Sequence, residues 1–90
     1  MAETVEKTEL TFDIYGRKLI KFVKEPDKDN PGKFIWISYY AGNEGKSRIA
    51  EDIAVPAGLP EEELSDFLDV LFHEEASPGK KISLINRKSS

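Results

Sequence analysis

Residues 60–76 (Pro-Glu-Glu-Glu-Leu-Ser-Asp-Phe-Leu-Asp-Val-Leu-Phe-His-Glu-Glu-Ala) constrain the fold more than any other stretch of this chain. Their large apolar side chains recur at the i, i+3, i+4, i+7 and i+8 spacing that gives an α-helix one apolar side. These side chains are Leu64, Phe67, Leu68, Leu71 and Phe72. The opposite side carries Glu62, Asp66, Asp69 and His73. The pattern predicts an amphipathic helix that packs its apolar side against the rest of the domain.

Both ends of this predicted helix carry boundary signals. Pro60 suits the first turn, where its missing N–H is not needed, and the three glutamates that follow favour the positive end of the helix dipole. Ser77-Pro78-Gly79 supplies a stop. Burying each large apolar side chain contributes roughly 1.5–3 kcal/mol before the ordering entropy is subtracted.

The N-terminal part of the chain predicts a β-hairpin. Apolar and polar residues alternate over residues 8–14, as in a half-buried strand, and residues 18–24 return as a second strand after a turn. The turn leaves two registers open. A two-residue loop with Gly16 first gives a type II′ turn. A three-residue loop instead aligns two apolar pairs on one face, Phe12 with Ile20 and Leu10 with Phe22.

Three further segments are predicted to be extended. Residues 34–40 carry large apolar side chains on both faces, which predicts a central strand that is covered on both sides. Residues 52–55 precede Pro56 and are interpreted as a short edge strand, and residues 81–86 as a last strand. The order along the chain is therefore β-β-β-(β)-α-β.

This order predicts an α+β fold, in which a mostly antiparallel sheet of three to five strands carries one long amphipathic helix, about 60–76, on one face. Ninety residues suffice for a single domain, 1–90, with an ordered core of about 8–86. Residues 1–7 and 87–90 are expected to be loose. An exposed sheet edge offers a route to a homodimer.

Composition narrows the function classes. The chain has no cysteine, so neither a disulfide framework nor a thiolate metal site is available. Its polar, acidic start differs from a secretory signal peptide, and no apolar run reaches membrane-spanning length. We therefore expect a cytoplasmic protein with no membrane partner and no cofactor.

Charge is distributed unevenly along the chain. Residues 51–79 contain nine acidic residues and no Lys or Arg, whereas residues 80–90 contain four basic residues and no acid. Charge of this density bears on partners and association rates, not on the fold. The helix is therefore a candidate docking surface for a basic protein partner, with solubility alone as the competing interpretation. The candidate partner-binding residues are Glu61, Glu62, Asp66, Asp69, His73 and Glu74.

A nucleic-acid interface is the alternative. On the surface of a sheet, aromatic side chains can stack on the bases of a single-stranded nucleic acid, and basic side chains can neutralise its phosphates. The candidate residues are Arg17, Lys18, Lys21, Trp36 and Tyr39. Aromatic residues of a central strand more often belong to the core, however, and the acidic helix would repel phosphates. Nucleic acid is therefore the less favoured partner.

Catalysis and metal binding lack their usual residues. The only histidine, His73, has no serine placed as a nucleophile beside it, so we expect a protein that is not an enzyme. Asp69 and His73 have the i, i+4 spacing that can share a divalent ion, but no second histidine supports a metal site. The Gly-Lys-Ser ending of residues 42–47 is typical of a phosphate loop, yet only two residues separate its glycines and no helix follows. We interpret it as a hairpin loop.

Several of these stretches resemble a family of short, uncharacterised bacterial proteins. They are Phe12-Asp13-Ile14-Tyr15-Gly16-Arg17, Asp52-Ile53-Ala54-Val55-Pro56, and Phe67 to Glu74 with Pro78-Gly79. The resemblance covers about residues 10–85. It implies a bacterial, cytoplasmic protein and carries over no functional residues. It draws attention to Arg17, His73 and Glu74, and we expect Glu75 to meet a basic group such as Arg17.

Overall fold

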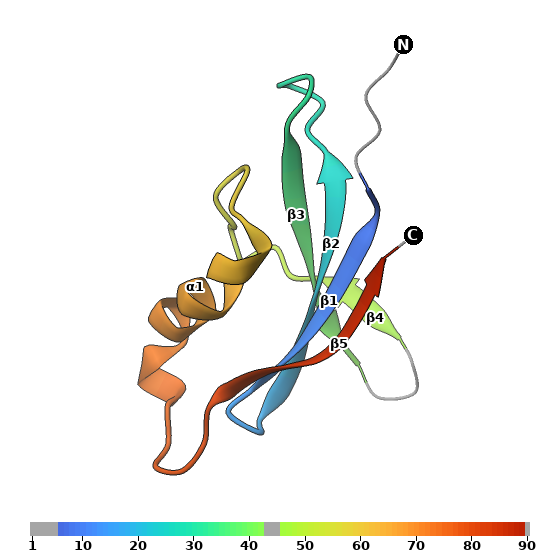
Figure 1. Cartoon of the computed structure of the whole chain (residues 1–90). Helices are drawn as coiled ribbons and strands as arrows, with labels where there is room; N and C mark the ends of the chain where they lie inside the picture. The colour runs from blue at the N-terminus through green and yellow to red at the C-terminus, as the bar shows by residue number, and fades with distance from the viewer. Residues whose placement is uncertain (1–5, 43–45, 90) are drawn as a thin grey trace.

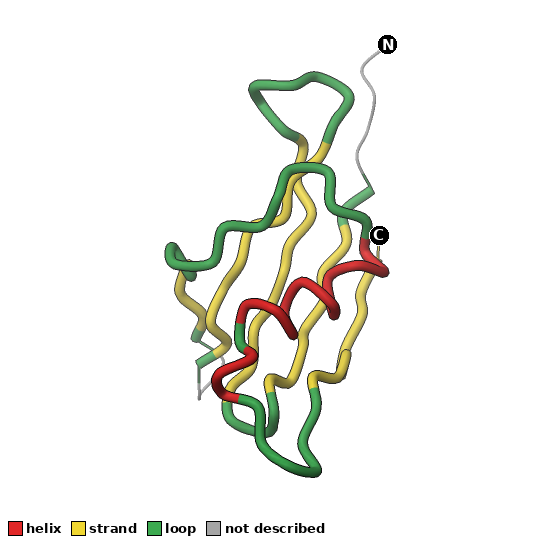
Figure 2. The backbone as a smooth tube through the Cα atoms, turned by 90° about the vertical axis from the view of Figure 1, so that its left-hand side faces the viewer, coloured by secondary structure: helices red, strands yellow, loops and turns green. Residues whose placement is uncertain are grey.

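The chain folds into one five-stranded antiparallel sheet with a single α-helix across one face, in a computed structural model that describes residues 6–42 and 46–89 (Figure 1). The strands lie in the order β4-β3-β2-β1-β5. Figure 2 shows the helix running obliquely across the strands. The elements are β1 (Thr8–Ile14), β2 (Lys18–Pro26), β3 (Phe34–Ala41), β4 (Ser47–Ile49), α1 (Leu64–Leu71) and β5 (Ile82–Ser89). The predicted α+β class is confirmed.

The first hairpin adopts the three-residue register. Phe12 pairs with Ile20, and the Arg17 N–H donates to the Ile14 carbonyl at 2.9 Å. Tyr15 and Gly16 have φ angles of 53° and 71°, as a type I′ turn requires at its two central positions. The type II′ alternative is therefore wrong. The left-handed Tyr15 is tolerated because its side chain is 5% exposed and its hydroxyl is hydrogen-bonded to the helix.

The fourth strand and the spatial order of the strands differ from the prediction. The edge strand is β4, at Ser47–Ile49, whereas residues 52–55 form no strand. The Ile53 N–H donates to the Ala50 carbonyl instead, in a turn that buries the Ile53 side chain. β3 lies second from the edge, and β2 occupies the centre of the sheet.

The last strand is longer than expected. β5 pairs antiparallel with β1 and extends to Ser89, so residues 87–89 belong to the sheet rather than to a loose end. Its register shifts between the pairs Thr11–Asn86 and Phe12–Leu84, which leaves Ile85 as the extra residue of a β-bulge. The outer edge of β5 is unpaired within the described chain.

The predicted long helix over 60–76 is wrong in length. α1 is an eight-residue α-helix, flanked by 3-10 turns at Glu61–Glu63 and His73–Glu75. The α-helical hydrogen bonds end with the Phe72 N–H donating to the Leu68 carbonyl. No basic residue lies in the last turn, and no side chain caps the first, so neither end is stabilised for a longer helix. No helix in the described part of the chain is long and apolar enough to cross a membrane.

The core lies between α1 and the covered face of the sheet. Leu64 and Leu68 are fully buried there, against strand residues such as Phe22. Phe22 meets Phe12 edge to face, with ring centroids 5.9 Å apart. The predicted apolar side of the helix is confirmed except at its end, because Leu71 is 42% exposed.

The segment between β4 and α1 closes the other end of this core. Its anchor is Trp36, which is 4% exposed and donates its indole N–H to the Leu59 carbonyl at 2.8 Å. The Gly58 N–H also donates to the Phe34 carbonyl, so residues 58–59 are fixed to β3. This segment therefore covers the part of the sheet that the short helix leaves free.

No helix formed by residues 6–42 or 46–89 covers the opposite face of the sheet (Figure 1). Strand alternation places Val23, Ile35, Ile37 and Tyr39 on this face, where they are half-buried by their neighbours. The expectation that residues 34–40 would be covered on both sides is therefore wrong for the chain by itself. Lys21 lies over the Tyr39 ring and 3.9 Å from Glu9, so polar groups border the apolar side chains.

One buried hydroxyl in the core gives a stability prediction. Ser38 is 4% exposed, and its Oγ has no hydrogen-bond partner among the described residues. An unpaired buried hydroxyl costs about 1–3 kcal/mol of desolvation. We expect Ser38→Ala to leave the free energy of unfolding unchanged or to raise it by up to about 1 kcal/mol, measured by urea denaturation. A loss of more than about 1 kcal/mol would mean that the hydroxyl is paired.

Candidate functional site

Three polar contacts attach the helical segment to the sheet. They lie at its beginning, middle and end, and each joins an acidic side chain to a group of a strand or turn. They are Arg87 with Glu61 (2.7 and 3.1 Å), Tyr15 with Asp69 (3.0 Å) and Lys18 with Glu75 (3.2 Å). The expected contact of Glu75 with Arg17 is wrong, because Arg17 donates to the Ser77 hydroxyl instead. The neighbouring Lys18 takes its place because it lies on the covered face of β2.

The contact between Arg87 and Glu61 is bidentate. Nε and one terminal nitrogen of the guanidinium donate to the two carboxylate oxygens, the geometry in which arginine binds carboxylates best. The hydrogen bonds from Arg87, and then its charge, hold the pKa of the Glu61 carboxyl below its ordinary 4.5. Glu61 is therefore a structural residue that ties the start of the helical segment to β5.

This pair predicts a pH-dependent loss of stability. The pKa of Glu61 is lower in the folded chain than in the unfolded chain. The contribution of the ionised Glu61 to the free energy of unfolding is therefore complete above the unfolded pKa of 4.5, and it disappears as the pH falls through the folded pKa. Glu61→Gln should lower the free energy of unfolding by about 0.5–1 kcal/mol at about pH 7 and by nothing measurable at about pH 2.5. Urea denaturation at both pH values tests this, with the exposed Glu63→Gln as the control. An equal loss at both pH values would contradict the assignment.

The remaining acidic residues form an outward surface. Glu62, Glu63, Asp66 and Glu74 are exposed, and none has an ion-pair partner within the described chain. Among them lies Val70, whose side chain is 76% exposed. We define the acidic outer face as Glu62, Glu63, Asp66, Val70, His73 and Glu74. Of the residues predicted from sequence, it lacks Glu61, which is paired, and Asp69, which accepts the Tyr15 hydroxyl.

Acidic residues at the end of α1 oppose its dipole. Asp69 lies in the last turn of the α-helix, and Glu74 follows it, where the backbone carbonyls already present partial negative charge. Each such placement costs up to about 0.3–1 kcal/mol at an exposed site. Glu75 is compensated by Lys18, whereas Glu74 has no basic partner in the described chain. Helix stability therefore does not account for Glu74.

The candidate nucleic-acid residues are not brought together. Trp36 lies buried on the covered face, whereas Lys21 and Tyr39 lie on the opposite face. Arg17 belongs to the turn before β2, and Lys18 is paired with Glu75 under the end of the helical segment. Trp36 and Tyr39 thus cannot stack on one strand of nucleic acid.

The candidate metal pair is also occupied by local contacts. The His73 Nδ1 lies 3.1 Å from the Val70 carbonyl, and Asp69 accepts the Tyr15 hydroxyl. Burial first, and then the hydrogen bond to Asp69, raises the pKa of Tyr15, so this phenol stays a donor at neutral pH. The described residues contain no group of three or more His, Cys, Asp or Glu side chains placed to hold a metal ion.

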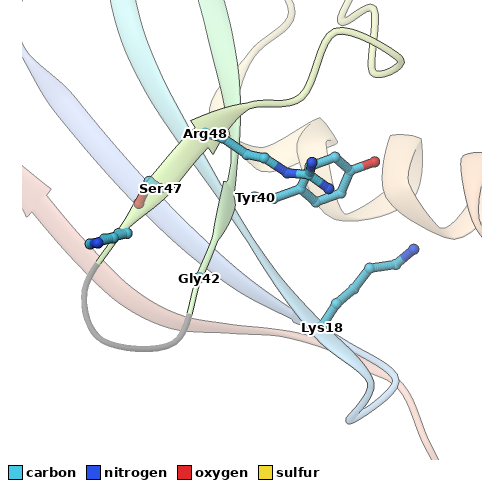
Figure 3. A pocket seen from close by; sticks show the side chains of 6 residues that line it. Lys18, Tyr40, Gly42, Ser47 and Arg48 are labelled. Atoms are coloured by element: carbon cyan, nitrogen blue, oxygen red, sulfur yellow. The ribbon is translucent and has the colours of Figure 1, made fainter.

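A cavity that sequence analysis missed opens where β3 and β4 meet (Figure 3). Its volume is about 610 Å³. Its lining residues are Lys18, Tyr40, Gly42, Lys46, Ser47 and Arg48. The connection between β3 and β4 joins antiparallel neighbours, as the hairpin interpretation of residues 42–47 predicted, and Asn43, Glu44 and Gly45 lie outside the described residues. No local motif brings Lys18 and Arg48 together, because they meet only through the pairing of three strands.

The Tyr40 hydroxyl is fixed beside this cavity. It donates to Asp52 at 2.6 Å, and this hydrogen bond is the main cause that raises the pKa of Tyr40 to about 12. The same hydrogen bond lowers the pKa of the Asp52 carboxyl, with smaller contributions from the charges of Lys18 and Arg48. Tyr40 therefore remains a neutral donor, and Asp52 remains an anion.

Comparison with known proteins identifies the family but no activity. A search of curated proteins finds no match, and a search of solved structures finds none either. One family model, that of a domain of unknown function, DUF7661, matches residues 9–86, a range that contains nearly all of the sheet and the whole helical segment. The chain is therefore a member of the DUF7661 family.

Proposed function

We propose that this domain is a non-catalytic interaction module that binds a basic protein partner through the acidic outer face, which α1 and its two flanking 3-10 turns form. The observation that carries the proposal is Val70, an aliphatic side chain 76% exposed among four exposed carboxylates without ion-pair partners in the described chain. Solubility alone would be served by the carboxylates, and Val70 adds to them an aliphatic side chain that a bound partner can desolvate.

The two kinds of side chain have separate roles in this proposal. The carboxylates steer a positively charged partner and raise the association rate, an effect that falls as salt is added. Val70, which is 76% exposed, supplies the apolar contact that is desolvated in the complex. The three contacts to the sheet hold the helical segment in place, so the surface is preformed and binding orders little of the chain.

Photo-crosslinking from position 70 tests the proposal. Because the chain resembles bacterial cytoplasmic proteins, the experiment uses soluble extract of the source cell. A photoreactive residue at Val70 should crosslink to one basic protein, and a matched probe at Val23, on the opposite face of the sheet, should not. The captured protein is then purified, and its binding to the unmodified chain is measured at low and at physiological salt.

Charge reversal supplies the matched controls. Glu62→Lys with Asp66→Lys should weaken the purified complex at least about 10-fold, whereas Glu25→Lys with Glu51→Lys changes the net charge equally and should not. Both pairs are exposed, so both double variants are expected to fold. Equal weakening by the two variants, or a crosslink only to a second copy of this chain, would contradict the proposal.

A further inference from the structure

We propose that the cavity between β3 and β4 binds a small organic oxyanion, whose carboxylate or phosphate group is held by Arg48 and Lys18 and whose body lies against Tyr40. This site is separate from the acidic outer face, which uses other residues of the chain.

Arg48 is the first residue that supports this assignment. It pairs with Tyr40 across β3 and β4, and its guanidinium lies over the Tyr40 ring, 5.4 Å from the centroid. Arg48 is exposed, so the N–H donors of its guanidinium are accessible to a ligand beside the ring. No carboxylate within the described chain forms an ion pair with it. A planar two-oxygen anion is the group that such a fork binds best.

Lys18 is oriented toward the same space (Figure 3). Its ammonium lies 3.2 Å from Glu75 and 4.5 Å from the centre of the Phe72 ring, so the long side chain is held rather than free. An ammonium has three donors, and the ion pair with Glu75 leaves donors for a second anion. Lys18 and Arg48 both line the cavity, so the two cations border the same space.

The charges around the cavity favour an anion with one or two negative charges. Lys18, Lys46 and Arg48 contribute three positive charges, against one each from Asp52 and Glu75. Asp52 is already engaged by the Tyr40 hydroxyl, so it is a weak competitor for Arg48. The net positive charge attracts a small anion but is too small for a polyanion such as nucleic acid.

The shape of the cavity favours an organic anion over a bare ion. A volume of about 610 Å³ lies within the range of small-molecule sites, which hold a ligand body as well as its charged group. Tyr40 lines the cavity, and the part of its ring that Arg48 leaves uncovered supplies an apolar wall. Gly42 also lines the cavity, and its lack of a side chain lets its backbone approach that of Lys46, to whose carbonyl the Gly42 N–H donates at 2.6 Å.

Chemical-shift titration with benzoate, phenyl phosphate and inorganic phosphate tests the proposal on the whole chain. At least one aromatic anion should cause saturable shifts of the amides at 40–42 and 46–48 and of the Arg48 side-chain Nε–H. Benzoate and phenyl phosphate distinguish a carboxylate ligand from a phosphate ligand. Inorganic phosphate should bind at least about 5-fold more weakly than the better of the two, because it lacks a body to contact Tyr40.

Variants of the two cations supply the specificity controls. Arg48→Gln and Lys18→Gln should each weaken binding about 10-fold or more, whereas Lys88→Gln, on the far edge strand β5, should change it less than 2-fold. Arg48 is exposed on a three-residue edge strand, so Arg48→Gln is expected to fold. No saturable shift with either aromatic anion, or equal weakening by Lys88→Gln, would overturn the proposal. Equal affinity for inorganic phosphate would overturn the assignment of an organic body.

Discussion

Phe22→Ala is expected to lower the free energy of unfolding by about 3–5 kcal/mol, a large part of the total for a domain of this size. Phe22 is fully buried on β2, the central strand, where it meets Phe12 edge to face. Its removal takes away the transfer free energy of the ring and leaves a cavity between the sheet and α1. Each kcal/mol lowers the melting temperature by about 4–8 °C, so calorimetry should detect the loss readily.

A matched control lies on the same strand. Leu19 faces the opposite side of the sheet and is 37% exposed. We expect Leu19→Ala to cost less than about 1.5 kcal/mol, because water already reaches the side chain and little cavity forms. Losses of equal size from the two variants would mean that something covers the open face of the sheet in solution.

Local sequence patterns predicted the first hairpin well. The alternation over β1 and the apolar pair of Phe12 with Ile20 fixed which side chains face inward. The turn type was harder, because a left-handed Tyr15 is unfavourable by itself. Its cost is offset by burial of the ring and by the hydrogen bond to Asp69, 54 residues away along the chain. Local sequence patterns cannot predict a contact between residues that lie so far apart along the chain.

The length of the helix was mispredicted for a related reason. Periodicity identified Leu64 and Leu68 as inward-facing, and both are fully buried. Periodicity does not say where hydrogen bonds change from α to 3-10, however. Glu61 and Glu75 are drawn to Arg87 and Lys18 on the sheet, and both acidic residues lie in 3-10 turns. Both ends of the α-helix therefore pass into 3-10 turns that are ion-paired to the sheet.

The candidate sites differ in how far the sequence could predict them. The acidic outer face follows from one local pattern, and the sequence identified Glu62, Asp66, His73 and Glu74, though not the isolated Val70. The cavity between β3 and β4 depends on two strand registers that bring Lys18, Tyr40 and Arg48 together. The sequence predicts the edge strand at residues 52–55 rather than at β4. The pairing of Arg48 with Tyr40 therefore could not be predicted from it.

Alanine substitutions on the two sides of α1 test the central claim that its apolar side is buried and its acidic outer face is free. Leu68 is fully buried, whereas Val70, two residues later in the same helix, is 76% exposed. We expect Leu68→Ala to lower the free energy of unfolding by about 2–5 kcal/mol and Val70→Ala to change it by less than about 0.5 kcal/mol, since alanine is also the better helix former.

Urea denaturation of the two variants beside the unmodified chain is the decisive measurement. The difference between their unfolding free energies should be about 2 kcal/mol or more in favour of Val70→Ala. Equal losses, or a larger loss from Val70→Ala, would show that the helix packs on a different side. The acidic outer face would then be turned inward, and the docking surface proposed for this domain would not exist.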